Sequence, residues 1–213
     1  MTGFPDTSLA NALLPHAFDT TDGAHDMAHL RRVWRNVQTI MEGEGGDADI
    51  LLAATILHDS VWVDKLSPDR PFGSRKAAEK ARKLLTALDW PQDRIKATCH
   101  AIAAHSYSAN ITPETLEARI LQDADRLDAL GHIGVARCLM TAGQGGQALY
   151  HETDPAAATR PLDEVAFCLD HFQTKLLRLA DSFQTDTGRV LAQDRTKTLK
   201  AFFDGLIAEV QGP

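Results

Sequence analysis

The stretch from Ile50 to Asp59, ILLAATILHD, constrains the fold more than any other part of this 213-residue chain. Eight residues, apolar except for one threonine, run directly into an adjacent histidine and aspartate. An apolar run of this length is typical of a buried helix or a buried strand, and its alanine pair and lack of valine favour a helix. Because an imidazole and a carboxylate are costly to desolvate, His58 and Asp59 indicate either a metal ion or a hydrogen-bond network at the end of that helix.

Helical spacing recurs along most of the remaining chain. The first clear helix begins near His25, and its buried face is formed by Leu30, Val33, Trp34, Val37, Ile40 and Met41. Further helices are expected at about 74–88, 91–105, 113–131 and 132–141, and two long amphipathic helices at 163–211, the first with apolar residues from Val165 to Leu179. The turn-rich segment 143–162 is a candidate for a mobile lid.

No segment of the sequence shows the alternating pattern of a convincing β-strand, and no linker separates two cores. We therefore predict an all-α, single-domain helical bundle over residues 1–213. Its core should lie at about 24–135, with the C-terminal helices of residues 163–211 packed on it.

Composition narrows the partners and the compartment. A net charge of −7 makes a nucleic-acid polymer a poor partner, although a small anionic substrate is compatible with local cations or a metal. The cysteines Cys99, Cys138 and Cys168 are odd in number and widely spaced, which indicates a reducing compartment without a disulfide framework. With no signal peptide and no apolar run of about 18 residues, the sequence predicts a cytoplasmic protein without a membrane partner.

Histidine and aspartate recur on separate predicted helices. His29 extends the buried stripe of the first helix, the His58–Asp59 pair follows, and LQDADRLDAL contributes Asp123 and Asp125. Two imidazoles and two carboxylates suit a divalent ion, which would activate a bound water and neutralise charge on a phosphoryl oxygen. Helical phase leaves the choice between Asp123 and Asp125 open. The alternative is a helical scaffold in which these groups pair with one another.

The motifs HDMAHLRRV, LLAATILHDS and QDADRLDAL resemble those of the HD-domain metal-dependent phosphohydrolases over roughly residues 24–135. Further along, HAIAAHSYS, LGHIGVARC and RPLDE resemble a subgroup of small bacterial HD proteins that act as nucleotide pyrophosphohydrolases. The resemblance implies a helical bundle of the HD-domain type.

The resemblance also implies a ligand set and a reaction. His29, His58, Asp59 and Asp125 would hold one divalent ion (Mn, Mg, Fe, Ni or Zn, with Mn favoured), and His25 would at most support the ligands. The implied activity is hydrolysis of a (deoxy)nucleoside triphosphate to the monophosphate and pyrophosphate. A nucleoside 5′-monophosphate phosphatase and a non-catalytic nucleotide-sensing module are the alternatives, and a homodimer is left open.

Several charged residues near these motifs are candidates for phosphate handling. Asp64 could polarise the attacking water, and the adjacent Lys65 could neutralise a phosphate. Arg75 and Lys76 stand in the first turn of a predicted helix, where cations oppose the helix dipole unless an anion binds there. Arg126 follows Asp125 directly and is a substrate or supporting group, or an ordinary surface arginine.

Two histidines on the helix expected at 91–105 remain to be placed. His100 and His105 are five residues apart, so their side chains point about 140° apart and cannot easily face the same ion. We expect one of them to face the site, as a phosphate donor or a ligand of a second metal, and the other to lie in the core or on the surface.

Overall fold

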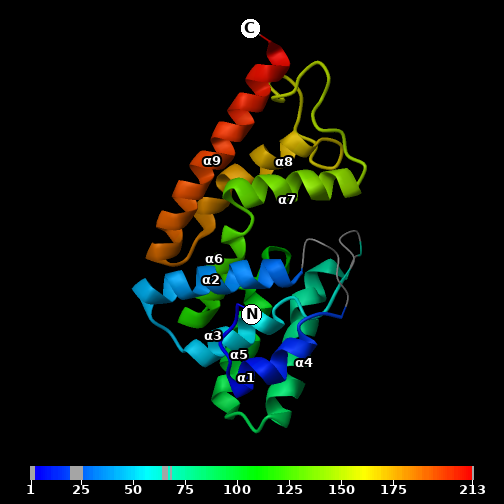
Figure 1. Cartoon of the computed structure of the whole chain (residues 1–213). Helices are drawn as coiled ribbons and strands as arrows, with labels where there is room; N and C mark the ends of the chain where they lie inside the picture. Colours follow the sequence, from blue (N-terminus) through cyan, green and yellow to red (C-terminus); the bar gives the residue numbers. More distant parts are fainter. Residues whose placement is uncertain (1–2, 20–25, 64–66, 68, 213) are drawn as a thin grey trace. The chain divides into compact units, whose positions relative to one another are not determined.

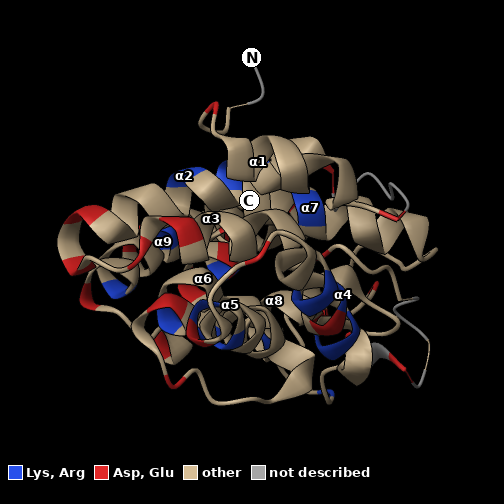
Figure 2. Ribbon diagram, turned by 90° about the horizontal axis from the view of Figure 1, so that it is seen from below, with Lys and Arg blue, Asp and Glu red and all other residues tan. Residues whose placement is uncertain are grey.

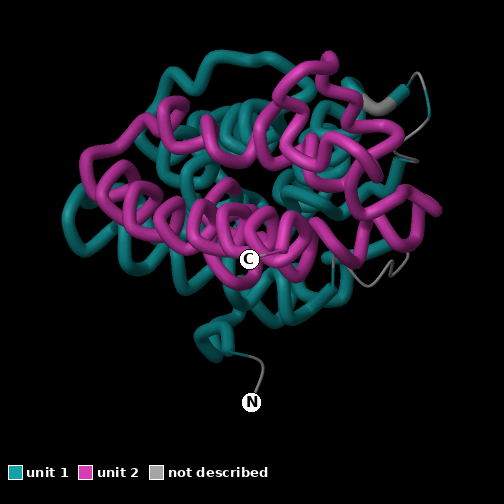
Figure 3. The backbone as a smooth tube through the Cα atoms, turned by 90° about the horizontal axis from the view of Figure 1, so that it is seen from above, with its two compact units in different colours: residues 1–125 teal, residues 126–213 magenta. Residues whose placement is uncertain are grey.

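The computed structural model describes residues 3–19, 26–63, 67 and 69–212 of the chain. It divides into two compact units, Met1–Asp125 and Arg126–Pro213 (Figure 3). Throughout the described residues the secondary structure is helical; no β-strand occurs, and one isolated bridge pairs Ala148 with Phe167. The predicted all-α fold class is therefore confirmed.

The helices of unit 1 are drawn in Figure 1. They are α1 (Ser8–Leu13), α2 (Met27–Glu44), α3 (Ala48–Leu57), α4 (Gly73–Ala87), α5 (Gln92–His105) and most of α6 (Leu116–Leu127), with short 3-10 turns at Leu14–His16 (η1), Arg70–Phe72 (η2) and Tyr107–Ala109 (η3).

Helix α3 lies at the centre of unit 1. It packs against α1, α2, α4 and α5, and every residue from Ile50 to Leu57 is buried. Asp47 caps the helix, because its carboxylate accepts hydrogen bonds from the backbone N–H groups of Asp49 and Ile50. Because α3 has no polar face, it is stable only where other helices cover it on all sides. The apolar run in the sequence predicted such a buried helix.

A serine at the start of a helix is a common N-cap residue, but Ser74 does not cap α4. Helix α4 begins at Gly73, so Ser74 is already inside its first turn. The hydroxyl of Ser74 donates to the carbonyl of Ala103 in α5 at 2.9 Å. The side chain therefore links two helices, because a buried hydroxyl needs a partner wherever it lies.

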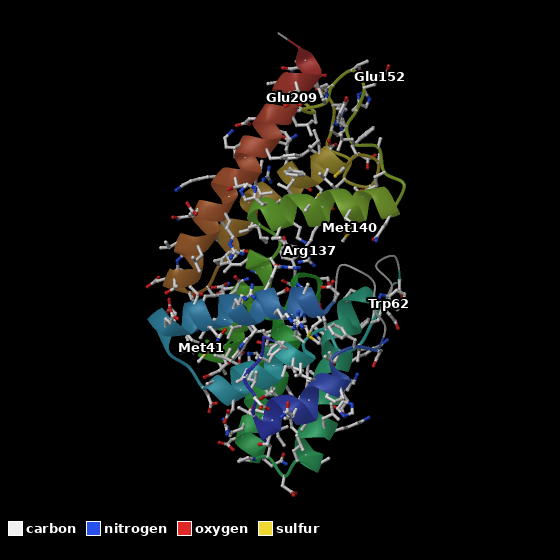
Figure 4. The ribbon with its side chains drawn as sticks, viewed as in Figure 1. Met41, Trp62, Arg137, Met140, Glu152 and Glu209 are labelled. Carbon is white, nitrogen blue, oxygen red and sulfur yellow. The ribbon has the colours of Figure 1, made fainter. Side chains whose placement is uncertain are left out.

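Unit 2 contains α7 (Gly131–Gln144), α8 (Cys168–Thr174), a 3-10 helix at Leu176–Ser182 (η4) and the long α9 (Asp186–Gln211). Helix α7 packs against α8 and α9, and η4 packs against both α8 and α9. Arg137 of α7, labelled in Figure 4, donates to the buried carboxylate of Asp128 at 2.6 Å. This ion pair holds the turn that leads into α7.

The prediction of two long helices at the C-terminal end is wrong for the first of them. The chain leaves the α-helical conformation at Lys175 and continues as a 3-10 helix. Leu176 and Leu179 stay buried because a three-residue period keeps them on the same face. Val165 precedes α8 and is 81% exposed, so it is not part of the buried stripe.

The segment between α7 and α8, expected to be a turn-rich lid, carries many internal hydrogen bonds. Asp154 accepts from the backbone N–H groups of Ala158, Thr159 and Arg160, and these bonds lower its pKa to about 2. The guanidinium of Arg160 binds both carboxylate oxygens of the buried Asp170 at 2.5 and 2.7 Å. The role of this loop as a lid stays a prediction.

Among the described residues, no helix combines the length and the apolar character that a membrane crossing requires.

Replacing Gly134 by alanine should destabilise unit 2. A Cβ atom at this position would lie 2.2 Å from the carbonyl oxygen of Ala129, which is backbone and cannot move aside cheaply. We expect the free energy of unfolding in a urea titration to fall by about 1–3 kcal/mol.

Gly205 in α9 supplies the matched control. Within the described part of the chain, nothing lies within 4 Å of a Cβ built on it, so Gly205→Ala should raise stability by about 0.5–1 kcal/mol. Equal stability of the two variants would contradict the clash at Gly134.

Candidate metal centre

Three helices of unit 1 bring the four predicted metal ligands together. His29 lies in the first turn of α2, His58 and Asp59 follow the last turn of α3, and Asp125 lies near the end of α6. His29 Nε2 is 3.5 Å from Asp125 Oδ1 and 3.8 Å from Asp59 Oδ2. His58 Nε2 is 3.4 Å from Asp59 Oδ2 and 3.8 Å from Asp125 Oδ1.

Two of these distances lie in the range expected around a shared divalent ion, and the two of 3.8 Å lie just above it. Donor atoms around one ion at about 2.0–2.2 Å are separated by roughly 3–3.6 Å. Nε2 of His58 is buried and forms no hydrogen bond with any of the described residues, which is costly unless a ligand occupies the cluster. The two histidine side chains are at most 1% exposed, whereas the carboxylates of Asp59 and Asp125 are 28% and 26% exposed. The cluster is therefore open on its carboxylate side.

His58 is oriented as a metal ligand requires. Its Nδ1 lies 2.8 Å from the carbonyl oxygen of Thr55, and because a carbonyl can only accept, Nδ1 carries the proton. The lone pair of Nε2 then faces the cluster. Burial lowers the pKa of His58, and the negative charge of Asp59 offsets this only in part. The imidazole is therefore kept neutral, which is the form that binds metals.

His105 is the member of the α5 pair that joins the cluster. Its Nε2 lies 3.5 Å from Asp59 Oδ1, and its ring packs edge-on against His58 with centroids 4.8 Å apart. Its Nδ1 is bound to the carbonyl of Ile102 at 2.6 Å. Burial acts to lower the pKa of His105, but the hydrogen bond to Asp59 and the charges of Asp59 and Asp125 outweigh it and raise the pKa.

His100 lies elsewhere on α5. It is half-buried, and its Nε2 accepts a hydrogen bond from the backbone N–H of Glu114 at 2.9 Å. The five-residue spacing thus separates the two histidines as expected, with one in the cluster and one outside it.

The structure also separates the two aspartates of α6. Asp125 lies among the potential ligands, whereas Asp123 is fully buried outside the cluster. Residues two apart on a helix point about 160° apart, so the two side chains face nearly opposite sides of α6. Three other predicted residues, His25, Asp64 and Lys65, lie outside the described residues.

The cationic residues that were predicted to bind substrate, Arg75, Lys76 and Arg126, are either exposed or paired with other protein groups. Lys76 forms an exposed ion pair with Asp69 at 2.7 Å, and Arg75 is exposed. Figure 2 shows that Lys and Arg positions recur along α4, which carries both residues. Arg126 donates to the carbonyl and the hydroxyl of Ser182, each at 2.9 Å, so its guanidinium is engaged within unit 2.

Three residues that hold the ligand-bearing segments in place were not anticipated from the sequence. Each donates a hydrogen bond to the backbone carbonyl next to a cluster residue. The bonds run from Asn36 to Ala124 at 2.9 Å, from Gln122 to Ala104 at 2.6 Å, and from Lys80 to Ser60 at 2.8 Å. They thereby fix the backbone beside Asp125, His105 and Asp59. Nothing in the spacing of an asparagine, a glutamine and a lysine would have indicated these partners.

An all-helical unit that gathers two histidines and two aspartates at one point offers ligands for a divalent ion, which can activate a bound water for hydrolysis. The chain belongs to the HD-domain family: residues 27–130 match the model of the HD domain. The Bacillus subtilis protein YpgQ is 32% identical over 192 residues, which are 88% of this chain and 85% of YpgQ.

Solved structures agree with this assignment. An HD-superfamily hydrolase from Bacillus thuringiensis matches with a TM-score of 0.73 and 27% identity, covering 96% of this chain and 97% of that one. YpgQ from Bacillus subtilis, solved in complex with ADP, matches with a TM-score of 0.67 and 28% identity, covering 93% of each chain. The chain is thus an HD-superfamily hydrolase of the metal-dependent phosphohydrolase kind, and its family binds a divalent metal. The identity of the ion and the role of each ligand stay predictions.

Replacing His58 by alanine should remove metal binding, because Nε2 of His58 lies close to both carboxylates of the cluster. We expect the affinity for Mn²⁺, measured by titration calorimetry, to fall at least 100-fold while the helical circular dichroism is retained. His100→Ala is the matched control, since it removes an imidazole from the cluster-bearing helix α5 but not from the cluster. An equal loss in both variants would argue against the assigned site.

Replacing Asn36 by alanine should weaken Mn²⁺ binding about 10- to 100-fold without abolishing it, because Asp125 would lose its backbone support. The control is Thr39→Ala on the same helix, where the exposed hydroxyl binds the carbonyl of Arg35 in the preceding turn. If Asn36→Ala lowered only the thermal stability and left the Mn²⁺ affinity unchanged, the positioning role would be wrong.

Proposed function

We propose that this protein is a (deoxy)nucleoside triphosphate pyrophosphohydrolase that releases a monophosphate and pyrophosphate. The observation that carries the proposal is the cluster of His29, His58, Asp59 and Asp125, with buried imidazoles and partly exposed carboxylates. These four residues would hold the metal. A divalent ion bound there supplies an activated water and neutralises negative charge on a phosphate oxygen.

The residues of the cluster differ in burial, and this suggests different roles. The imidazoles of His29 and His58 are buried inside the unit, where solvent does not reach them. The open carboxylate side of the cluster is where a phosphate can approach. His105 is held beside Asp59, with Nε2 3.5 Å from Oδ1, and in its doubly protonated form it would donate from Nε2 to an anionic oxygen.

The phosphate chain requires cations beyond the metal. Arg75 and Lys76 lie in the first turn of α4, where backbone N–H groups also favour an anion. The ion pair of Lys76 with Asp69 is exposed at both ends, so a phosphate can replace Asp69 at little cost. Asp64 and Lys65 are proposed to polarise the attacking water and to neutralise a phosphate, and this rests on their place in the sequence after Asp59.

Exposed aromatic side chains support a substrate with a planar ring. Trp62 (labelled in Figure 4) follows α3, Tyr107 follows α5, and Phe72 belongs to η2, which packs against η3. All three are at least half exposed, and the first two lie within three residues of a cluster residue. Flat, exposed rings near a phosphate site suit stacking with a nucleobase. The ADP complex of the relative YpgQ is consistent with a nucleotide here.

The test is a metal-dependent screen with separated products. Nucleoside and deoxynucleoside triphosphates incubated with Mn²⁺ should yield the monophosphate and pyrophosphate, resolved by chromatography. Nucleoside monophosphates should be stable, and tripolyphosphate should be a poor substrate because it offers no ring to stack. Release of phosphate from monophosphates would instead establish the phosphatase alternative.

The His58→Ala variant distinguishes the site from a contaminant. It should lose turnover by at least 1,000-fold, whereas His100→Ala should retain most of it. Binding of triphosphates without turnover under any divalent metal would favour the sensing module. Assembly as a homodimer and organisation as one domain stay predictions.

A further inference from the structure

Unit 2 brings two of the three cysteines into contact. The Sγ atoms of Cys138 on α7 and Cys168 at the start of α8 are 3.7 Å apart, although the residues are 30 positions apart in the sequence. Both thiols are free. Cys138 is half-buried and Cys168 is buried, so the pair lies just below the surface, with Cys138 as its accessible side.

The backbone around Cys168 is already fixed. Its N–H donates to the carbonyl of Ala148 at 2.9 Å, and the N–H of Leu169 donates to that of Leu149 at 3.0 Å. The N–H of Ala148 donates in turn to Ala166 at 3.1 Å. These bonds hold the two ends of the segment between α7 and α8 side by side. The contact between the two sulfur atoms is therefore supported by the backbone.

We propose that Cys138 and Cys168 form a redox-active dithiol, a modification site that hydrogen peroxide converts reversibly into a disulfide within unit 2. A disulfide requires about 2.05 Å between sulfurs, so each atom must move by less than about 1 Å. Rotation of the two side chains about their Cα–Cβ bonds supplies a shift of this size. The two helices do not have to separate.

The surroundings favour ionisation of one partner. The hydrogen bond between the two thiols lowers the pKa of Cys168, and the same bond, together with burial, raises the pKa of Cys138. The positive charge of Lys175 lies close enough to act on Cys138. A lowered pKa increases the share of thiolate, which is the reactive form of a cysteine.

The proposed reaction balances with peroxide as the oxidant. The thiolate of one of the two cysteines attacks one peroxide oxygen, the O–O bond breaks, and the departing hydroxide takes up a proton to give water. The sulfur of the other cysteine then displaces the hydroxyl of the resulting sulfenic acid, which leaves with the thiol proton as a second water. Two thiols lose two protons and two electrons, and one peroxide becomes two waters.

Cys99 is the internal contrast. It belongs to unit 1, is buried, and donates to the carbonyl of Ala78 at 3.3 Å. Burial raises its pKa, and among the described residues no second cysteine lies beside it. It should therefore stay reduced under conditions that oxidise the pair.

Thiol titration of the full-length protein tests the proposal. Before treatment the unfolded protein should show three reactive thiols, and after brief exposure to hydrogen peroxide only one. The intact mass should fall by about 2 Da, and peptide mapping without reductant should show Cys138 linked to Cys168. Dithiothreitol should restore all three thiols. A disulfide between chains or to Cys99, or oxygen addition without a cross-link, would overturn the proposal.

Serine variants of the three cysteines test which two of them are linked. Cys99→Ser should still form the disulfide, whereas Cys138→Ser and Cys168→Ser should not. Closing a loop of this length should also raise the thermal midpoint of the oxidised wild-type protein by several degrees over the reduced form. Disulfide formation in either single variant of the pair, which could only involve another cysteine, would count against the assignment.

Discussion

The candidate metal site of unit 1 depends on the desolvation of one imidazole. His58 ends the central helix of the unit, and it is 1% exposed. Its Nδ1 is bound to Thr55 within the same helix, which leaves Nε2 directed at two carboxylates from different segments. A buried nitrogen without a hydrogen-bond partner is costly, and a cation bound between it and the two carboxylates would remove that cost. Metal binding should therefore stabilise the fold of unit 1.

Much of this arrangement could be predicted from the sequence, because it depends on local patterns of apolar and polar residues. The apolar run of α3 predicted a buried helix, and the phase of His29 within α2 predicted its inward direction. Periodicity could not choose between Asp123 and Asp125, since both lie on a helix with apolar neighbours on two sides. It was the resemblance to the HD family that favoured Asp125, and the structure places that residue in the cluster.

What the sequence could not show are contacts between distant positions. The bond from Asn36 to Ala124 joins residues 88 positions apart, and the bond from Gln122 to Ala104 joins residues 18 positions apart. Neither amide has a distinctive spacing. The break between α8 and η4 was missed for a related reason: Phe172, Leu176 and Leu179 have the spacing of an amphipathic helix, and burial against α9 is compatible with a 3-10 geometry as well.

The helix ends that meet at the cluster influence the order in which an ion and an anion can bind there. Helices α3 and α5 finish at the cluster, and Asp125 lies in the last turn of α6, so three carboxyl-terminal helix ends, each with a partial negative charge, surround the same point. Together with Asp59 and Asp125 they would repel a phosphate before a cation is bound, and the amino-terminal end of α2 at His29 opposes this only in part. The proposed function therefore implies an order of binding in which the ion enters before the anion or as a complex with it.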